Sequence, residues 1–112
     1  MSKTLFGTTT VTVGDRTYTL VPTLDAVRRI ESRLGGLRGA NQALNALSVD
    51  GTAHIVASGA GLKVEEAEGL AEKVWQAGVL EIATQVTPFL VALYNPRGGE
   101  AGKPETVKAS AP

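Results

Sequence analysis

His54 and two nearby serines are the residues of this 112-residue chain whose types and spacing come closest to catalytic chemistry. Ser58 follows His54 by four residues, and Ser48 precedes it by six. A serine nucleophile needs a base and also an acidic group that orients the base. No acid stands in an orienting position beside this pair. We therefore expect no catalytic residue and no enzymatic activity.

The sequence also lacks the residues that metal and cofactor sites need. The chain has one histidine and no cysteine, so thiolate sites and paired-histidine zinc sites are excluded. Two glycine clusters, at 35–39 and 59–61, lack the G-x-x-x-x-G-K-[ST] spacing of a phosphate-binding loop, and neither follows an expected strand. Such clusters are typical of helix ends. We expect no cofactor and no metal.

A small basic group is the one feature that could contact phosphates. Nucleic-acid sites usually combine basic residues with aromatic side chains on which bases stack, but this group has acidic residues and no aromatic residue beside it. Its members are Arg28, Arg29, Arg33 and Arg38. The chain also has 11 basic and 11 acidic residues, so no net field attracts a polyanion. The pattern predicts a solvated helix face and no nucleic-acid partner.

An acidic stripe is a better candidate for binding a partner. Glu65, Glu68 and Glu72 recur at steps of three and four residues, which places them on one side of a helix. Glu68 and Glu72 form a like-charge pair that costs the helix roughly 0.2–0.5 kcal/mol. A stripe that works against its own helix favours a basic partner segment, although a plain solvated face remains the alternative.

Trp75 is the only tryptophan, and it follows Val74 on the same expected helix. One of these two side chains should face the core and the other its edge. Large aromatic residues at an edge are common anchors of protein interfaces. A core position is also open to Trp75, because this chain has few large side chains with which to fill a core.

The elements that must position these residues begin with a hairpin. Two alternating, β-branched runs at 8–13 and 16–20 flank Gly14-Asp15, which predicts a two-residue type II′ turn. In that register Val11 lies opposite Tyr18. Val11, Val13, Tyr18 and Leu20 then share an apolar face, which should pack on helices while a strand edge stays available for self-association.

Apolar residues at helical spacing follow the hairpin to residue 93. Helices are expected at 24–34 after a Thr23 cap, at 37–47, between Ser48 or Asp50 and the glycines at 59–61, at 64–77, and at 79–93. Pro88 should kink the last helix. The fold class is therefore α+β, an N-terminal β-hairpin followed by a small bundle of four or five short α-helices. We assign residues 1–94 to a single domain and 95–112, which holds little to bury, to a flexible tail.

No stretch reaches the ~18 consecutive apolar residues of a membrane span, and the N-terminus lacks the apolar run of a signal peptide. The absence of cysteine suits a reducing compartment. We expect no membrane partner and a location in the cytoplasm.

Two stretches resemble a known family. "TYTLVPTLDAVRRIESRLGG" and "ASGAGLKVEEAEGLAEKVWQAGVLEIATQVTPFLVALYNP" are similar in their order of features to the tail assembly chaperones of gene transfer agents and long-tailed bacteriophages, a family also labelled as tail-tube proteins. The resemblance covers about residues 10–96. Its pieces include the strand–Pro22–Thr23 step, the turn before the acidic helix, and the Ala77-Gly78 break. Lys63 departs from it, because Ser or Thr commonly caps the acidic helix there.

The resemblance implies a non-enzymatic assembly factor. It would coat the helical tape-measure protein, help recruit the tail-tube protein, and act in the cytoplasm of the bacterial host. An apolar, kinked C-terminal helix would present a groove to an amphipathic helix. The candidate partner-binding residues are Glu65, Glu68, Glu72, Trp75, Phe89 and Leu93.

Two other readings remain open. The chain could be a structural tail-tube or connector component of the virion, although its hairpin is short for a sheet that must close a ring. It could also be a small helical DNA-binding regulator, which its neutral charge disfavours.

Overall fold

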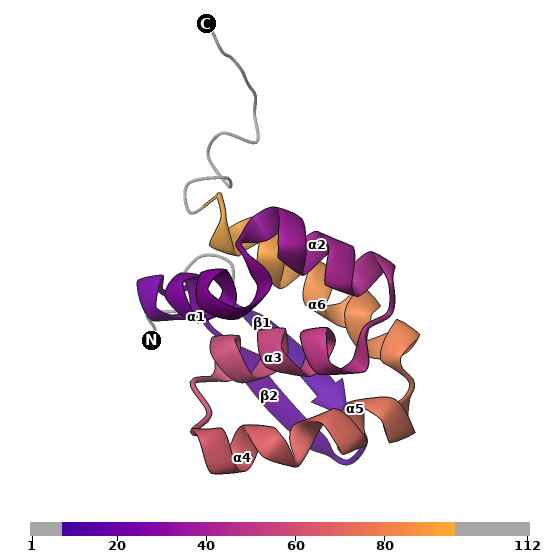
Figure 1. The fold of residues 1–112 in the computed structure, drawn as a ribbon. Coiled ribbons are helices and arrows are strands. Elements are labelled where there is room, and N and C mark those ends of the chain that lie inside the picture. The colour runs from indigo at the N-terminus through magenta and orange to yellow at the C-terminus, as the bar shows by residue number, and fades with distance from the viewer. Residues whose placement is uncertain (1–7, 96–112) are drawn as a thin grey trace, which may run out of the picture.

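The computed structural model describes residues 8–95 of the chain (Figure 1). A two-stranded antiparallel hairpin lies behind a layer of helices, so the fold is mixed α+β and mostly helical, as the sequence predicts. The elements are β1 (Thr9–Val13), β2 (Arg16–Leu20), α1 (Leu24–Leu34), α2 (Leu37–Asn45), α3 (Val49–Ala60), α4 (Val64–Glu68), α5 (Leu70–Ala77) and α6 (Val79–Leu93). The predicted tail falls, after Asn95, outside the described residues.

The hairpin has the predicted register. Val11 pairs with Tyr18, and the turn has a positive φ of 64° at Gly14 and none at Asp15, as a type II′ turn requires. Val11, Val13 and Leu20 are buried in the core, and Tyr18 packs against it. The other face consists of exposed threonines, because side chains alternate across a strand.

A side chain covers part of one edge of the hairpin. The backbone N–H of Thr12 donates to Oε1 of Gln85 at 2.9 Å, and Nε2 of Gln85 donates to the Thr12 carbonyl at 3.0 Å. Gln85 therefore occupies the outward backbone groups of Thr12 and ties β1 to α6.

Helix α3 is the centre of the helical layer. Eight of its twelve residues are buried, and Ser48 caps it by accepting a hydrogen bond from the Gly51 N–H at 2.9 Å. The alternative cap, Asp50, is wrong. A Cβ atom built on Gly59 would lie 2.7 Å from Phe89 and 2.9 Å from Leu20, so glycine permits α3 to approach β2 and α6.

The acidic helix expected at 64–77 is broken at Gly69 into α4 and α5. Glycine is a poor helix former, which lets the chain tighten at this point. Lys63 has no side-chain oxygen with which to cap α4. Part of this missing cap is replaced by Glu66 within the helix, whose Oε1 accepts a hydrogen bond from the Lys63 backbone N–H at 2.9 Å.

Two of the predicted partner-binding residues lie on the buried face of helix α6, so that part of the prediction is wrong. Phe89 is 0% exposed and Leu93 is 5% exposed, so both belong to the core and not to a surface offered to a partner. Helical periodicity shows that these residues share a face, and α3 and the hairpin cover that face. The helix continues through Pro88, which lies on the exposed side.

Within residues 8–95 no single helix is long and apolar enough to cross a membrane. The segments Val64–Ala77 and Val79–Leu93 pass that test only as a pair, and they are bent by 117° relative to each other.

Candidate functional site

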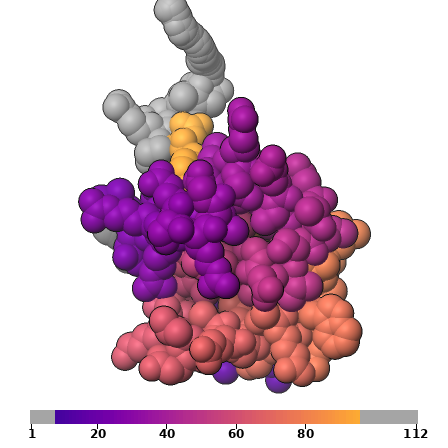
Figure 2. All heavy atoms as spheres, viewed as in Figure 1, coloured from indigo at the N-terminus to yellow at the C-terminus, as the bar shows by residue number. Residues whose placement is uncertain are grey.

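A groove of about 870 Å³ lies on the helical face of the described residues. Figure 2 shows this face, with α1 above α4 and the groove between them. Helix α3 supplies the floor, α1 supplies one wall, and the segment from Leu62 through α4 supplies the other, with Ala71 of α5 at the end. No residue of α6 lines it, so this helix does not form the groove that the sequence suggested.

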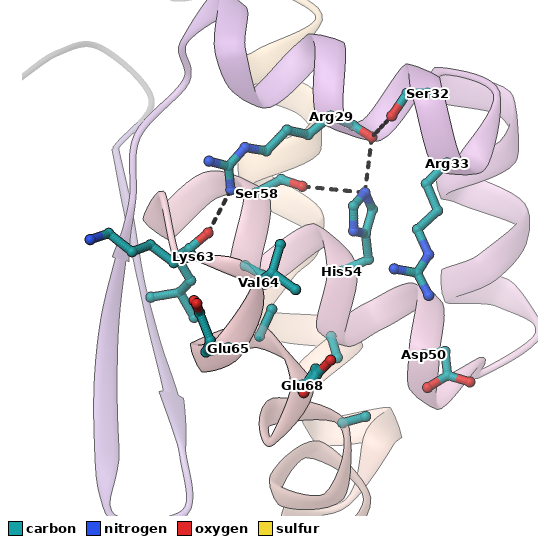
Figure 3. A pocket seen from close by; sticks show the side chains of 15 residues that line it. Arg29, Ser32, Arg33, Asp50, His54, Ser58, Lys63, Val64, Glu65 and Glu68 are labelled. Atoms are coloured by element: carbon teal, nitrogen blue, oxygen red, sulfur yellow. Dashed lines mark hydrogen bonds between the residues drawn. The ribbon is translucent and has the colours of Figure 1, made fainter.

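Arg29 holds the two walls together (Figure 3). Its Nη1 donates to the Leu62 carbonyl at 2.8 Å, and its Nε lies 3.0 Å from Oδ2 of Asp25. Its own backbone carbonyl accepts hydrogen bonds from His54 and from the Ser32 hydroxyl. One residue of α1 thereby fixes the chain leaving α3 and orients a side chain of the groove floor.

His54 is a structural residue in this arrangement. Its Nε2 lies 2.9 Å from the Arg29 carbonyl oxygen, which can only accept, so Nε2 carries the proton. The Ser58 hydroxyl is 3.5 Å from the same nitrogen. A protonated nitrogen cannot take a proton from Ser58, so this geometry does not activate the serine as a nucleophile.

The surroundings of His54 also keep the ring neutral. Burial lowers the pKa of His54 below its ordinary value of 6.5, and the hydrogen bond to the Arg29 carbonyl opposes that change. The positive charges of Arg33 and Arg29 lower the pKa further. A neutral imidazole leaves the groove floor uncharged near pH 7.

The groove carries both signs of charge around a floor of small side chains. Its cationic residues are Arg29, Arg33 and Lys63, and its anionic residues are Asp50, Glu65 and Glu68. Its alanines come from three helices, as Ala53, Ala57, Ala67 and Ala71. Val64 adds an apolar side chain that is 73% exposed.

The structure separates the predicted partner-binding residues into three places. Glu65 and Glu68 line the groove, whereas Glu72 lies outside it and accepts a hydrogen bond from Gln76. Trp75 is 66% exposed, outside the groove, and its neighbour Val74 is buried, which settles which of the two faces the core. Phe89 and Leu93 are core residues.

Sequence reasoning missed Arg29, Val64 and the alanines. Arg29 was assigned to a solvated face, and only its i, i+4 spacing from Asp25 pointed to a defined position. No local signal marks Ala53 or Ala57 as groove residues, because that depends on how far α4 stands from α1.

No group of three or more histidine, aspartate or glutamate residues within 8–95 is arranged to hold a metal ion. Comparisons with known proteins give no relative: no protein family, no curated protein and no solved structure matches this chain.

Proposed function

We propose that this protein is a tail assembly chaperone without enzymatic activity, which binds the tape-measure protein of a phage-like tail and helps recruit tail-tube subunits. It would act in the cytoplasm of the bacterial host. The observation that carries the proposal is the groove between α1, α3 and α4, which is open, lined by four alanines and bordered by charges of both signs.

The shape of the groove suits a helix. Alanines that line the groove allow a partner backbone to come close, because the distance between packed helix axes, about 8–10 Å, depends on the size of the side chains at the contact. Exposed Val64 offers an apolar contact at the rim. These are the features of helix-in-groove recognition.

The charges of the groove favour an amphipathic helix over a polyanion. Arg33 and Lys63 have no ion-pair partner among the residues that the structure describes, and neither have Glu65 and Glu68. Charged residues flanking the apolar stripe of a tape-measure helix can pair with both sets, which fixes the orientation of the bound helix.

The test is co-elution of this protein with purified tape-measure fragments in size-exclusion chromatography. We expect the wild-type chain to form a complex and the V64E variant to lose it, because V64E places a charge against the apolar stripe of the ligand. V91E is the matched control, since Val91 is also an exposed valine at 61% but lies on α6, outside the groove.

Failure of the wild-type chain to bind any tape-measure fragment would contradict the proposed function. Equal loss of binding in V64E and V91E would contradict the proposed site.

A further inference from the structure

The outer edge of β2 presents backbone hydrogen-bonding groups that could pair with another strand. In a hairpin with a two-residue turn, Val13–Arg16 is a hydrogen-bonded pair, and the pairs Thr12–Thr17 and Thr10–Thr19 direct their backbone groups outward. On β1 the outward groups of Thr12 are taken by Gln85. On β2, no described residue outside the hairpin bonds to the outward groups of Thr17 and Thr19.

This open edge has a defined length. The turn at Gly14-Asp15 ends it on one side, and on the other side the Val21 N–H donates to the Gly59 carbonyl of α3 at 3.0 Å. Four groups remain between these limits, the N–H and C=O of Thr17 and of Thr19. The edge also lacks the lysine, proline or bulge with which proteins usually block strand pairing.

We propose that two copies of this chain pair through β2, antiparallel and about a two-fold axis at Tyr18. In this register Thr17 of one copy faces Thr19 of the other, so all four outward groups of each copy are satisfied. The axis is perpendicular to the sheet, and the two hairpins become one four-stranded sheet with a continuous threonine face.

The side chains are compatible with this register. Arg16 faces Leu20 of the second copy, so no like charges lie opposite each other along the paired strands. The two Tyr18 rings flank the axis as a close cross-strand pair. Arg16 already lies 5.8 Å from the centre of the Tyr18 ring of its own chain, and it is diagonal to Tyr18 of the second copy.

A second copy fits this edge better than an unrelated strand does. A two-fold register uses the same short edge twice, with both ends limited in the same way. On β1 the outward groups of Thr12 are already bonded to Gln85, which leaves a shorter stretch for pairing than β2 offers. The proposal is independent of the groove and of the tape-measure protein.

The test compares variants that carry charges at the paired positions. In T17K/T19K both cross-strand pairs join like charges, whereas in T17K/T19E both join opposite charges. Sedimentation velocity over a concentration series should show a dimer for the wild-type chain and for T17K/T19E. The T17K/T19K variant should dissociate, with a dissociation constant raised at least about tenfold.

Two controls make the result specific. T10K/T12K adds the same two charges to β1 and should leave the dimer intact, with far-UV circular dichroism confirming that every variant is folded. Q85A uncovers the edge of β1 and should convert dimers into longer oligomers. A wild-type chain that stays monomeric into the millimolar range would overturn the proposal, even if an unrelated strand bound the edge. Equal dimer dissociation constants for T17K/T19K and T17K/T19E would overturn it as well.

Discussion

At the scale of single residues, the groove depends on polar groups that are satisfied inside the protein. Arg29 uses both its guanidinium and its carbonyl to connect α1 with α3 and with Leu62. His54 contributes a hydrogen bond to the Arg29 carbonyl, a longer contact with the Ser58 hydroxyl, and no charge. The polar side chains best able to take part in a reaction therefore hold the fold together, and the side chains that remain exposed in the groove suit binding.

The first prediction concerns the pH dependence of stability. The pKa of His54 is lowered in the folded protein, so between that value and 6.5 the unfolded chain binds more protons than the native one. The contribution of His54 to the free energy of unfolding should therefore be fully present above pH 6.5, and the free energy of unfolding should fall as the pH decreases below that value. Urea unfolding at pH 7.5 and pH 5.5 measures this change. H54Q removes the titrating group, and an equal loss of stability in that variant would contradict the assignment.

The second prediction concerns a buried hydroxyl. Thr52 is 0% exposed, and its Oγ1 has no hydrogen-bond partner within the described part of the chain. T52V should raise the free energy of unfolding by about 1 kcal/mol, because it replaces an unpaired polar group by a methyl group of similar size. T87V is the control, since the Thr87 hydroxyl donates to the Ala83 carbonyl at 2.9 Å and its loss should bring no gain. Chemical denaturation of both variants decides the point.

At the scale of elements, two glycines have opposite roles. Gly59 sits where α3 meets Phe89 and Leu20, so G59A should destabilise the protein by about 1–3 kcal/mol through overpacking. Gly69 has helical dihedral angles and nothing within 4 Å of an added Cβ, so G69A should stabilise the protein by about 0.5–1 kcal/mol. Thermal unfolding of the two variants should give shifts of opposite sign, and a gain from G59A would show that the packing of α3 is wrong.

Sequence patterns predicted most elements because their signals are local. The Gly14-Asp15 turn fixed the hairpin register, and Thr23 and Gly35 mark the ends of α1 through their own side chain or backbone. The surface of α6 could not be predicted in the same way. Periodicity puts Phe89 and Leu93 on one face, but only the packing of α3 and the hairpin decides that this face is covered.

At the scale of the whole molecule, the two proposed binding features lie on different elements. The groove is formed by α1, α3 and α4, whereas the open strand edge belongs to β2. A dimer formed through β2 would therefore leave both groove floors in place and could engage a long helical partner at two points, with a gain from effective concentration.

The fourth prediction distinguishes a chaperone from a virion component. A chaperone leaves when assembly ends, so mass spectrometry of purified tail particles should detect the tape-measure and tube proteins and little or none of this chain. Abundant copies in finished particles would favour the tail-tube or connector alternative.

The most direct measurement for the central claim is the methyl NMR spectrum of the protein labelled at alanine, titrated with a tape-measure fragment. The groove alanines Ala53, Ala57, Ala67 and Ala71 should shift on binding, and Ala40 and Ala92, which lie in the core outside the groove, should not. A spectrum without changes, or changes confined to alanines outside the groove, would contradict the claim that this protein shelters a helix between α1, α3 and α4.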